Sequence, residues 1–157
     1  MNELQNPDAQ VDADAFTVRR AIRIDAPVEK VWAAVTEPAL ISQWFGRAEF
    51  SGVEAGSLGT LSWEGRDPIP VRIEAVDAPH SITYAWNNDD ASGTVPLRFD
   101  ESTATTFIFR LAPVDGGTEL TVVETLFERT SDAGANMAFH RIGWTAELDK
   151  LVALVQA

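Results

Sequence analysis

Apolar and polar residues alternate along most of this chain, and this two-residue period is typical of strands with one buried face. The first such segment is 16–24, where Val18, Ile22 and Ile24 share one parity. The same pattern predicts further strands at 47–51, 58–64, 69–76, 80–86, 103–111 and 119–127. Short turns rich in glycine, proline and aspartate join most of these segments, which favours an antiparallel sheet of six to seven strands. Residues 94–100 fit either an edge strand or a loop.

Two regions show the helical period of about 3.6 residues instead. The run IDAPVEKVWAAVTEPALISQWFG (24–46) predicts two short helices. A proline opens each of them, where its missing N–H would be unpaired anyway. Ser131 or Asp132 can cap a long final helix that runs to about Val155. One side of this helix is apolar, so we expect it to lie against the sheet.

The 157 residues suit one domain, which the patterning places at residues 16–157. Residues 1–15 are polar, acidic and aperiodic, so we expect a disordered or loosely docked tail there. The formal net charge of −12 repels phosphate and anionic lipid, which disfavours nucleic acid and membrane surfaces as partners. The sequence shows no signal-peptide pattern and no apolar run of membrane-spanning length, so we expect a cytoplasmic protein.

The sequence contains few residues that could bind a metal or a cofactor. The chain contains no cysteine and has two histidines, His80 and His140, so a transition-metal site would need mainly carboxylates. None of the motifs GxGxxG, GxxxxGK[ST], HExxH and GxSxG occurs. We therefore expect no cofactor and no metal, and any catalysis would be acid/base chemistry in a pocket.

Glu124 is the first candidate site residue. Leu120, Val122, Glu124 and Leu126 alternate together on the last predicted strand, so this carboxylate lies in an apolar row. Burial would raise the pKa of the Glu124 carboxyl unless a partner stabilises its charge. It would then act as a polar anchor or a general acid/base in a pocket. The alternative is that Glu124 pairs with an arginine or lies near solvent at the strand end.

His140 is the second candidate, because it lies one turn from both Met137 and Trp144 on the apolar side of the final helix. Its imidazole would face either a ligand or an ordinary packing interface. A further hypothesis is that His140 and Glu124 meet across the interior, where they would be weak catalytic candidates. Gly143, in the same helix, marks either a close approach to a strand or a bend that opens interior space.

Aromatic residues form facing rows in the predicted sheet. With Trp63 and Trp144, these rows would line an apolar pocket of roughly 300 to 1,000 Å³, or they would simply fill the core. Trp32 and Trp44 are expected to be packing residues. The candidate ligand-binding residues are Trp63, Ile73, Tyr84, Trp86, Phe107, Phe109, Val122, Glu124, Met137, His140 and Trp144.

Several segments resemble those of a known family. The runs IDAPVEKVWAAVTEPALISQWFG, GTLSWEG, ITYAW, GGTELTVVETLF and GWTAELDKLVALV are similar to the activator of heat-shock protein 90 ATPase homologue family. This family belongs to the START-like, birch-pollen-allergen-like and polyketide-cyclase superfamily (SRPBCC), and the resemblance extends from Phe16 to the C-terminus. It implies an α+β helix-grip fold, in which a curved antiparallel sheet grips the long C-terminal helix and two short helices follow strand 1. It also implies binding of apolar small molecules.

Three functions follow from these observations. The leading hypothesis is a START-like protein that binds a small apolar or amphipathic ligand between the sheet and the final helix. The first alternative is a cofactor-free cyclase, hydratase or hydrolase that uses Glu124 and His140 for proton transfer. The second is a co-chaperone-like interaction module, whose partner would be a chaperone or, through an edge strand, a second copy of the chain.

Overall fold

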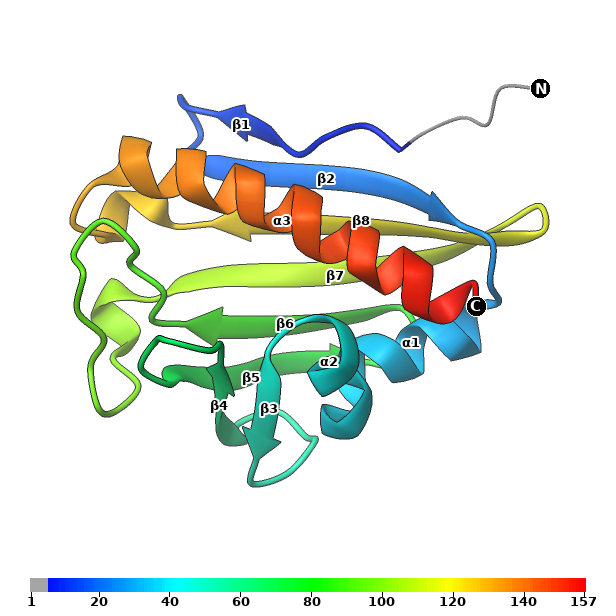
Figure 1. The fold of residues 1–157 in the computed structure, drawn as a ribbon, viewed down its shortest axis with the longest axis horizontal. Helices are drawn as coiled ribbons and strands as arrows, with labels where there is room; N and C mark the ends of the chain where they lie inside the picture. The colour runs from blue at the N-terminus through cyan, green and yellow to red at the C-terminus, as the bar shows by residue number, and fades with distance from the viewer. Residues whose placement is uncertain (1–5) are drawn as a thin grey trace.

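The structure, a computed structural model, describes residues 6–157 (Figure 1). Eight antiparallel strands form one sheet: β1 (Gln10–Asp12), β2 (Thr17–Ile24), β3 (Arg47–Phe50), β4 (Leu58–Ser62), β5 (Ile69–Asp77), β6 (Ser81–Trp86), β7 (Thr105–Val114) and β8 (Gly117–Thr125). The helices are α1 (Val28–Thr36), α2 (Pro38–Trp44) and α3 (Ala133–Val155), and two short 3₁₀ turns are η1 (Glu101–Thr103) and η2 (Phe127–Arg129). The strand order across the sheet is β1-β2-β8-β7-β6-β5-β4-β3.

The long helix α3 crosses one face of the curved sheet, and α1 and α2 lie at one end of it (Figure 1). Because the helix pair carries the chain to the far edge of the sheet, β2 pairs with the last strand, β8. The Asp132 side chain caps α3 by accepting from the Ala135 N–H, as the sequence predicts. This arrangement confirms the α+β helix-grip fold.

The core lies between the sheet and α3. The buried residues of α3 are Asn136, Met137, His140, Trp144, Leu148, Leu151 and Val155. They face aromatic rows on β6 and β7, where Phe107 and Phe109 are fully enclosed. Trp44 is also buried, and its indole N–H donates to the Ala34 carbonyl at 2.8 Å, so its predicted packing role is confirmed.

Arg20 is a buried cation on the inward face of β2 that the sequence pattern did not single out. Its side chain is 1% exposed. The guanidinium donates to the carbonyls of Pro7 (2.7 Å) and Thr145 (2.9 Å) and to the Asp149 carboxylate (2.8 Å). One side chain therefore connects the segment before β1, the strand β2 and the second half of α3.

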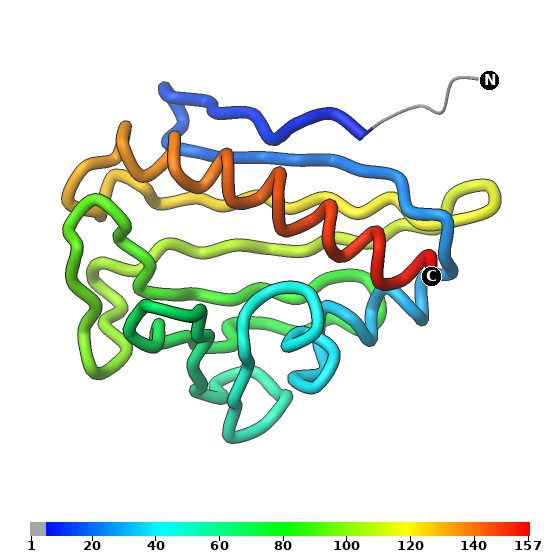
Figure 2. The backbone as a smooth tube through the Cα atoms, in the orientation of Figure 1, coloured from blue at the N-terminus to red at the C-terminus, as the bar shows by residue number. Residues whose placement is uncertain are grey.

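The N-terminal segment differs from the expected tail. Gln10–Asp12 pairs with β2 as an edge strand, which makes the sheet eight-stranded, and the two segments run side by side in Figure 2. Ala9 is buried, and its N–H donates to the Thr145 hydroxyl at 3.0 Å. The expectation of a disordered or loosely docked tail is therefore wrong for residues 9–12, because pairing and burial hold them on the sheet. Residues 1–5 lie outside the described part of the chain.

Two further boundaries differ from the prediction. The strand β8 ends at Thr125 rather than at residue 127, because Leu126 adopts a left-handed conformation (φ 73°) and turns the chain into η2. Leu126 therefore does not continue the inward row, and the fully buried Phe127 follows it into the core instead. Residues 94–100 form a loop and not an edge strand.

The Arg20 contacts generate a stability prediction. Replacing Arg20 with leucine leaves the partly buried carbonyls of Pro7 and Thr145 without their donor, so the free energy of unfolding should fall by about 2–3 kcal/mol. The matched control is Arg19→Leu, because Arg19 is exposed on the opposite face of the same strand and should change stability by no more than about 0.5 kcal/mol. Urea unfolding measures both, and equal losses in the two variants would contradict the anchoring role.

Candidate functional site

Glu124 lies near the end of β8 with no solvent exposure. Its Oε2 accepts hydrogen bonds from the Trp86 indole N–H (2.8 Å) and the Thr105 hydroxyl (2.6 Å). Its Oε1 accepts from the Trp144 indole N–H (2.9 Å) and lies 2.8 Å from His140 Nδ1. The carboxylate thus has four partners, from β6, β7 and α3. The hypothesis that Glu124 and His140 meet in the interior is confirmed.

His140 has acceptors at both ring nitrogens. Its Nδ1 faces Glu124, while its Nε2 lies 3.0 Å from the Asn88 carbonyl and 3.2 Å from the Asp90 carboxylate. Both nitrogens can bond to these oxygens only when each carries a proton. The geometry therefore favours a charged imidazolium that is sandwiched between two carboxylates.

The pKa shifts of the pair follow from the same contacts. Burial opposes the charge on His140, but Glu124 and Asp90 outweigh this effect and raise the pKa of His140 to about 10. Burial also acts to raise the pKa of Glu124, yet the His140 charge and the hydrogen bonds from Thr105 and Trp86 outweigh it. The pKa of Glu124 therefore lies below its usual range, because His140 stabilises the buried charge.

The loop after β6 is fixed to the start of α3 by two neighbouring aspartates. Asp89 accepts hydrogen bonds from the backbone N–H and hydroxyl of Ser131 and from the Asn136 amide. Asp90 pairs with Arg66 at 2.7 Å as well as with His140. Both views show this loop beside the first turns of α3 (Figures 1 and 2). These contacts make the loop a fixed wall.

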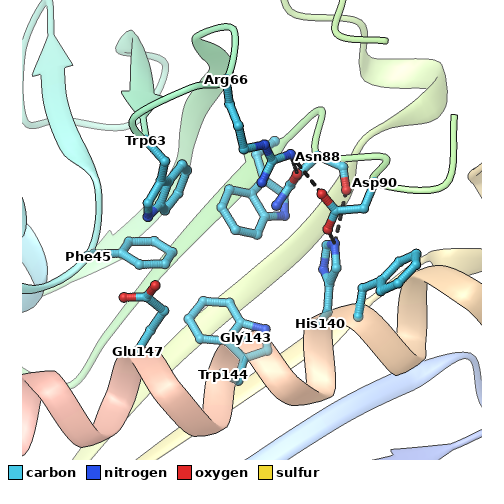
Figure 3. A pocket seen from close by; sticks show the side chains of 11 residues that line it. Phe45, Trp63, Arg66, Asn88, Asp90, His140, Gly143, Trp144 and Glu147 are labelled. Atoms are coloured by element: carbon cyan, nitrogen blue, oxygen red, sulfur yellow. Dashed lines mark hydrogen bonds and ion pairs between the residues drawn. The ribbon is translucent and has the colours of Figure 1, made fainter. Parts of the chain in front are cut away.

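A cleft of about 220 Å³ opens beside this wall (Figure 3). Its lining comes from the end of α2, the turn after β4, the end of β6, the following loop and α3. The lining residues are Phe45, Trp63, Arg66, Trp86, Asn88, Asp90, Phe139, His140, Gly143, Trp144 and Glu147. Aromatic rings therefore form most of the apolar lining of the cleft, and the charged side chains lie at its rim.

Two glycines shape the cleft. At Gly46 a Cβ atom would lie 2.9 Å from ring atoms of Trp63, so the missing side chain lets that indole pack closely. At Gly143 a Cβ atom would meet nothing within 4 Å. Gly143 lies between His140 and Glu147 on the cleft face of α3, so the absence of its side chain leaves the helix surface open. Of the two earlier interpretations, the structure favours open space over close approach.

Glu147 lines the cleft together with Asp90, and its environment contrasts with that of the fully buried Glu124. Its side chain is 18% exposed and lies 2.6 Å from Lys150 Nζ, one turn further along α3. The contact is made by the enclosed Oε2, which has no other partner among the described residues. Burial raises the pKa of Glu147, although Lys150 partly offsets this effect.

The sequence matches the family model described as "Activator of Hsp90 ATPase homolog 1-like protein" over residues 25–156. The chain belongs to this family. The resemblance noted from its sequence segments is therefore confirmed. A comparison with curated proteins gave no match.

Solved structures show the same fold. The chain is similar to protein MLL2253 from Mesorhizobium loti (TM-score 0.74, 25% identity, covering 89% of this chain and 96% of that one). It is also similar to CalU16 from Micromonospora echinospora (TM-score 0.66, 23% identity, 88% and 75%). DynU16, from the dynemicin biosynthetic locus, gives a TM-score of 0.71 at 22% identity, with 90% of this chain and 47% of that chain covered.

The structure divides the predicted ligand-binding residues into three groups. Trp63, Trp86, His140 and Trp144 line the cleft. Tyr84, Phe107 and Phe109 surround a separate void of only about 10 Å³. Ile73, Val122, Glu124 and Met137 are buried and line neither space. The cleft is smaller than the expected pocket of roughly 300 to 1,000 Å³ because stacked rings fill the deep part of the interior.

Sequence reasoning missed several lining residues: Phe45, Arg66, Asn88, Asp90, Phe139 and Glu147. Most of them lie in turns or on the flank of α3, outside the strand parity and the apolar stripe that guided the prediction. The NNDDASG segment (87–93) carried a local signal, because a run of turn-forming polar residues often places side chains at the rim of a sheet.

Residues 6–157 lack two kinds of feature. No helix in this part of the chain is both long and apolar enough to cross a bilayer. The same residues contain no group of three or more side chains placed to bind a metal ion.

The buried pair predicts a pH dependence of stability. The pKa of His140 rises from 6.5 unfolded to about 10 folded, so its contribution is complete below pH 6.5 and is lost as the pH rises toward 10. Between pH 6 and pH 9 the free energy of unfolding should therefore fall by an amount on the order of a few kcal/mol. Urea unfolding of the wild type and of the double variant Glu124→Gln/His140→Gln measures this, and the variant should lose most of the slope. Parallel pH profiles would contradict the charged pair.

Proposed function

We propose that this protein binds a small amphipathic molecule in the cleft between the sheet and α3. The observation that carries the proposal is the bare helix surface at Gly143, which faces about 220 Å³ of space floored by aromatic rings. A cleft with apolar walls and a few polar groups at its rim suits a small organic ligand. Membership of a START-like family supports the same function.

Binding is favoured over proton-transfer catalysis by the state of Glu124 and His140. A general base needs a free lone pair within reach of the substrate proton. Glu124 is fully buried and has four hydrogen-bond partners, and both nitrogens of His140 face protein acceptors. This pair therefore positions the cleft wall, and the acid/base alternative loses its candidate residues.

The interaction-module alternative would use the outer surface, where Leu58 on β4 and Leu97 in the loop 94–100 are exposed. A few exposed leucines are common on protein surfaces. A chaperone or a second copy as partner stays a prediction.

Filling the cleft tests the proposed function. Gly143→Leu should place a side chain in the open space and abolish ligand retention. Replacement of a helix glycine should at the same time keep or raise the free energy of unfolding, by about 0.5–1 kcal/mol. Native mass spectrometry after incubation with a small-molecule cell extract provides the readout.

The matched control is Gly134→Leu, in the first turn of the same helix but outside the cleft lining. The wild type and this control should retain the same added mass, and Gly143→Leu should not. An identical retained mass on Gly143→Leu, or none on the wild type, would contradict binding in the cleft.

A further inference from the structure

The charges of the cleft balance one another except at one end. Arg66 and His140 both pair with Asp90, and His140 also pairs with Glu124 beneath the floor. Two cations therefore meet two carboxylates on the side of the fixed loop. Glu147 remains at the opposite end, as Figure 3 shows.

Glu147 has one cationic partner, and that partner lies at the surface. Its enclosed Oε2 forms an ion pair with Lys150 Nζ at 2.6 Å and has no further partner among the described residues, whereas the Glu124 carboxylate has four. The nearest cation, Lys150, has a side chain that is 53% exposed, so water screens its charge. A partly buried carboxylate of this kind is stabilised most by a donor that carries a positive charge.

The rings beside Glu147 favour the same kind of group. Phe45 and Trp63 meet edge to face with ring centroids 5.1 Å apart, and the Glu147 carboxylate points toward Phe45 (Figure 3). Trp86 and Trp144 continue the aromatic surface, 6.0 Å apart. The faces of such rings attract cations. The net charge of −12 adds a long-range attraction for a positive ligand.

We propose that the cleft selects small molecules that carry a protonated amine on an apolar body. The ammonium group would pair with Glu147 beside Phe45 and Trp63, and the apolar body would occupy the space left open by Gly143. A carboxylate ligand is disfavoured because Arg66 is already paired with Asp90. This inference rests on the proposed function, since it names the ligand class of the same cleft.

Three probes of similar shape and different charge test the selection: 2-phenylethylammonium, 2-phenylethanol and 3-phenylpropanoate. Their dissociation constants follow from NMR titration of the wild-type protein, with the indole N–H signals of Trp63, Trp86 and Trp144 as reporters. The ammonium probe should bind about tenfold more tightly than the alcohol, the difference expected between a charge-assisted and a neutral hydrogen bond. The carboxylate should bind most weakly.

Two variants locate the selectivity. Glu147→Gln keeps the shape of the side chain without its charge and should bring the ammonium-to-alcohol ratio close to one. Lys150→Met, outside the cleft lining, removes the competing cation and should increase that ratio. An unchanged ratio in Glu147→Gln would overturn the inference.

The outcomes also separate this inference from the proposed function. Equal binding of the three probes to the wild type, abolished by Gly143→Leu, would overturn ammonium selection and leave binding in the cleft intact. Tightest binding of 3-phenylpropanoate would likewise overturn it and assign recognition to Arg66. The absence of any indole shift with all three probes would overturn both.

Discussion

The carboxylate of Glu124 joins segments that lie far apart in the sequence, because its oxygens are bonded by side chains from β6, β7 and α3. A charge buried this deeply is costly unless it is paired and fully hydrogen-bonded, so the surrounding positions must supply donors. His140 is one of these donors. Its second nitrogen also contacts Asn88 and Asp90, and these contacts hold the loop after β6 in place. The wall of the cleft is therefore positioned by an ion pair inside the core.

The same interior has two different parts. Around Tyr84, Phe107 and Phe109 the rings pack closely, face to face or edge to face, and leave only about 10 Å³ of empty space. Toward the end of the sheet where β6 meets the fixed loop, about 220 Å³ remains open beside Gly143. Gly143 contributes to this open space, because a side chain in its place would extend into the cleft. A helix-grip protein can thus have a solid centre and still keep a binding space at one end.

The family and the similarity to MLL2253 and CalU16 account for the architecture of the chain. They do not determine which ligand the cleft would bind, because that depends on individual side chains. In this chain a charge-balanced side, formed by Arg66, Asp90 and His140, lies opposite Glu147, whose one cationic partner is the solvent-exposed Lys150. Burial of Glu147 and the aromatic rings around it give the cleft a polarity along its length. That polarity, rather than the fold, is what would distinguish one small ligand from another.

The sequence by itself determined the order of strands and helices, the cap at Asp132 and the inward row that contains Glu124, because local periodicity and capping depend on neighbouring residues. It also brought Glu124 and His140 together as a hypothesis. It missed the edge strand β1 and the buried Arg20, since short polar segments acquire structure only from the strand and helix they meet. It could not separate rings that fill the core from rings that line a cleft, nor foresee Arg66, Asp90 and Glu147 at its rim. Those outcomes depend on how turns and one helix flank meet in space, and only the tertiary structure decides which volumes remain empty and which charges have buried partners.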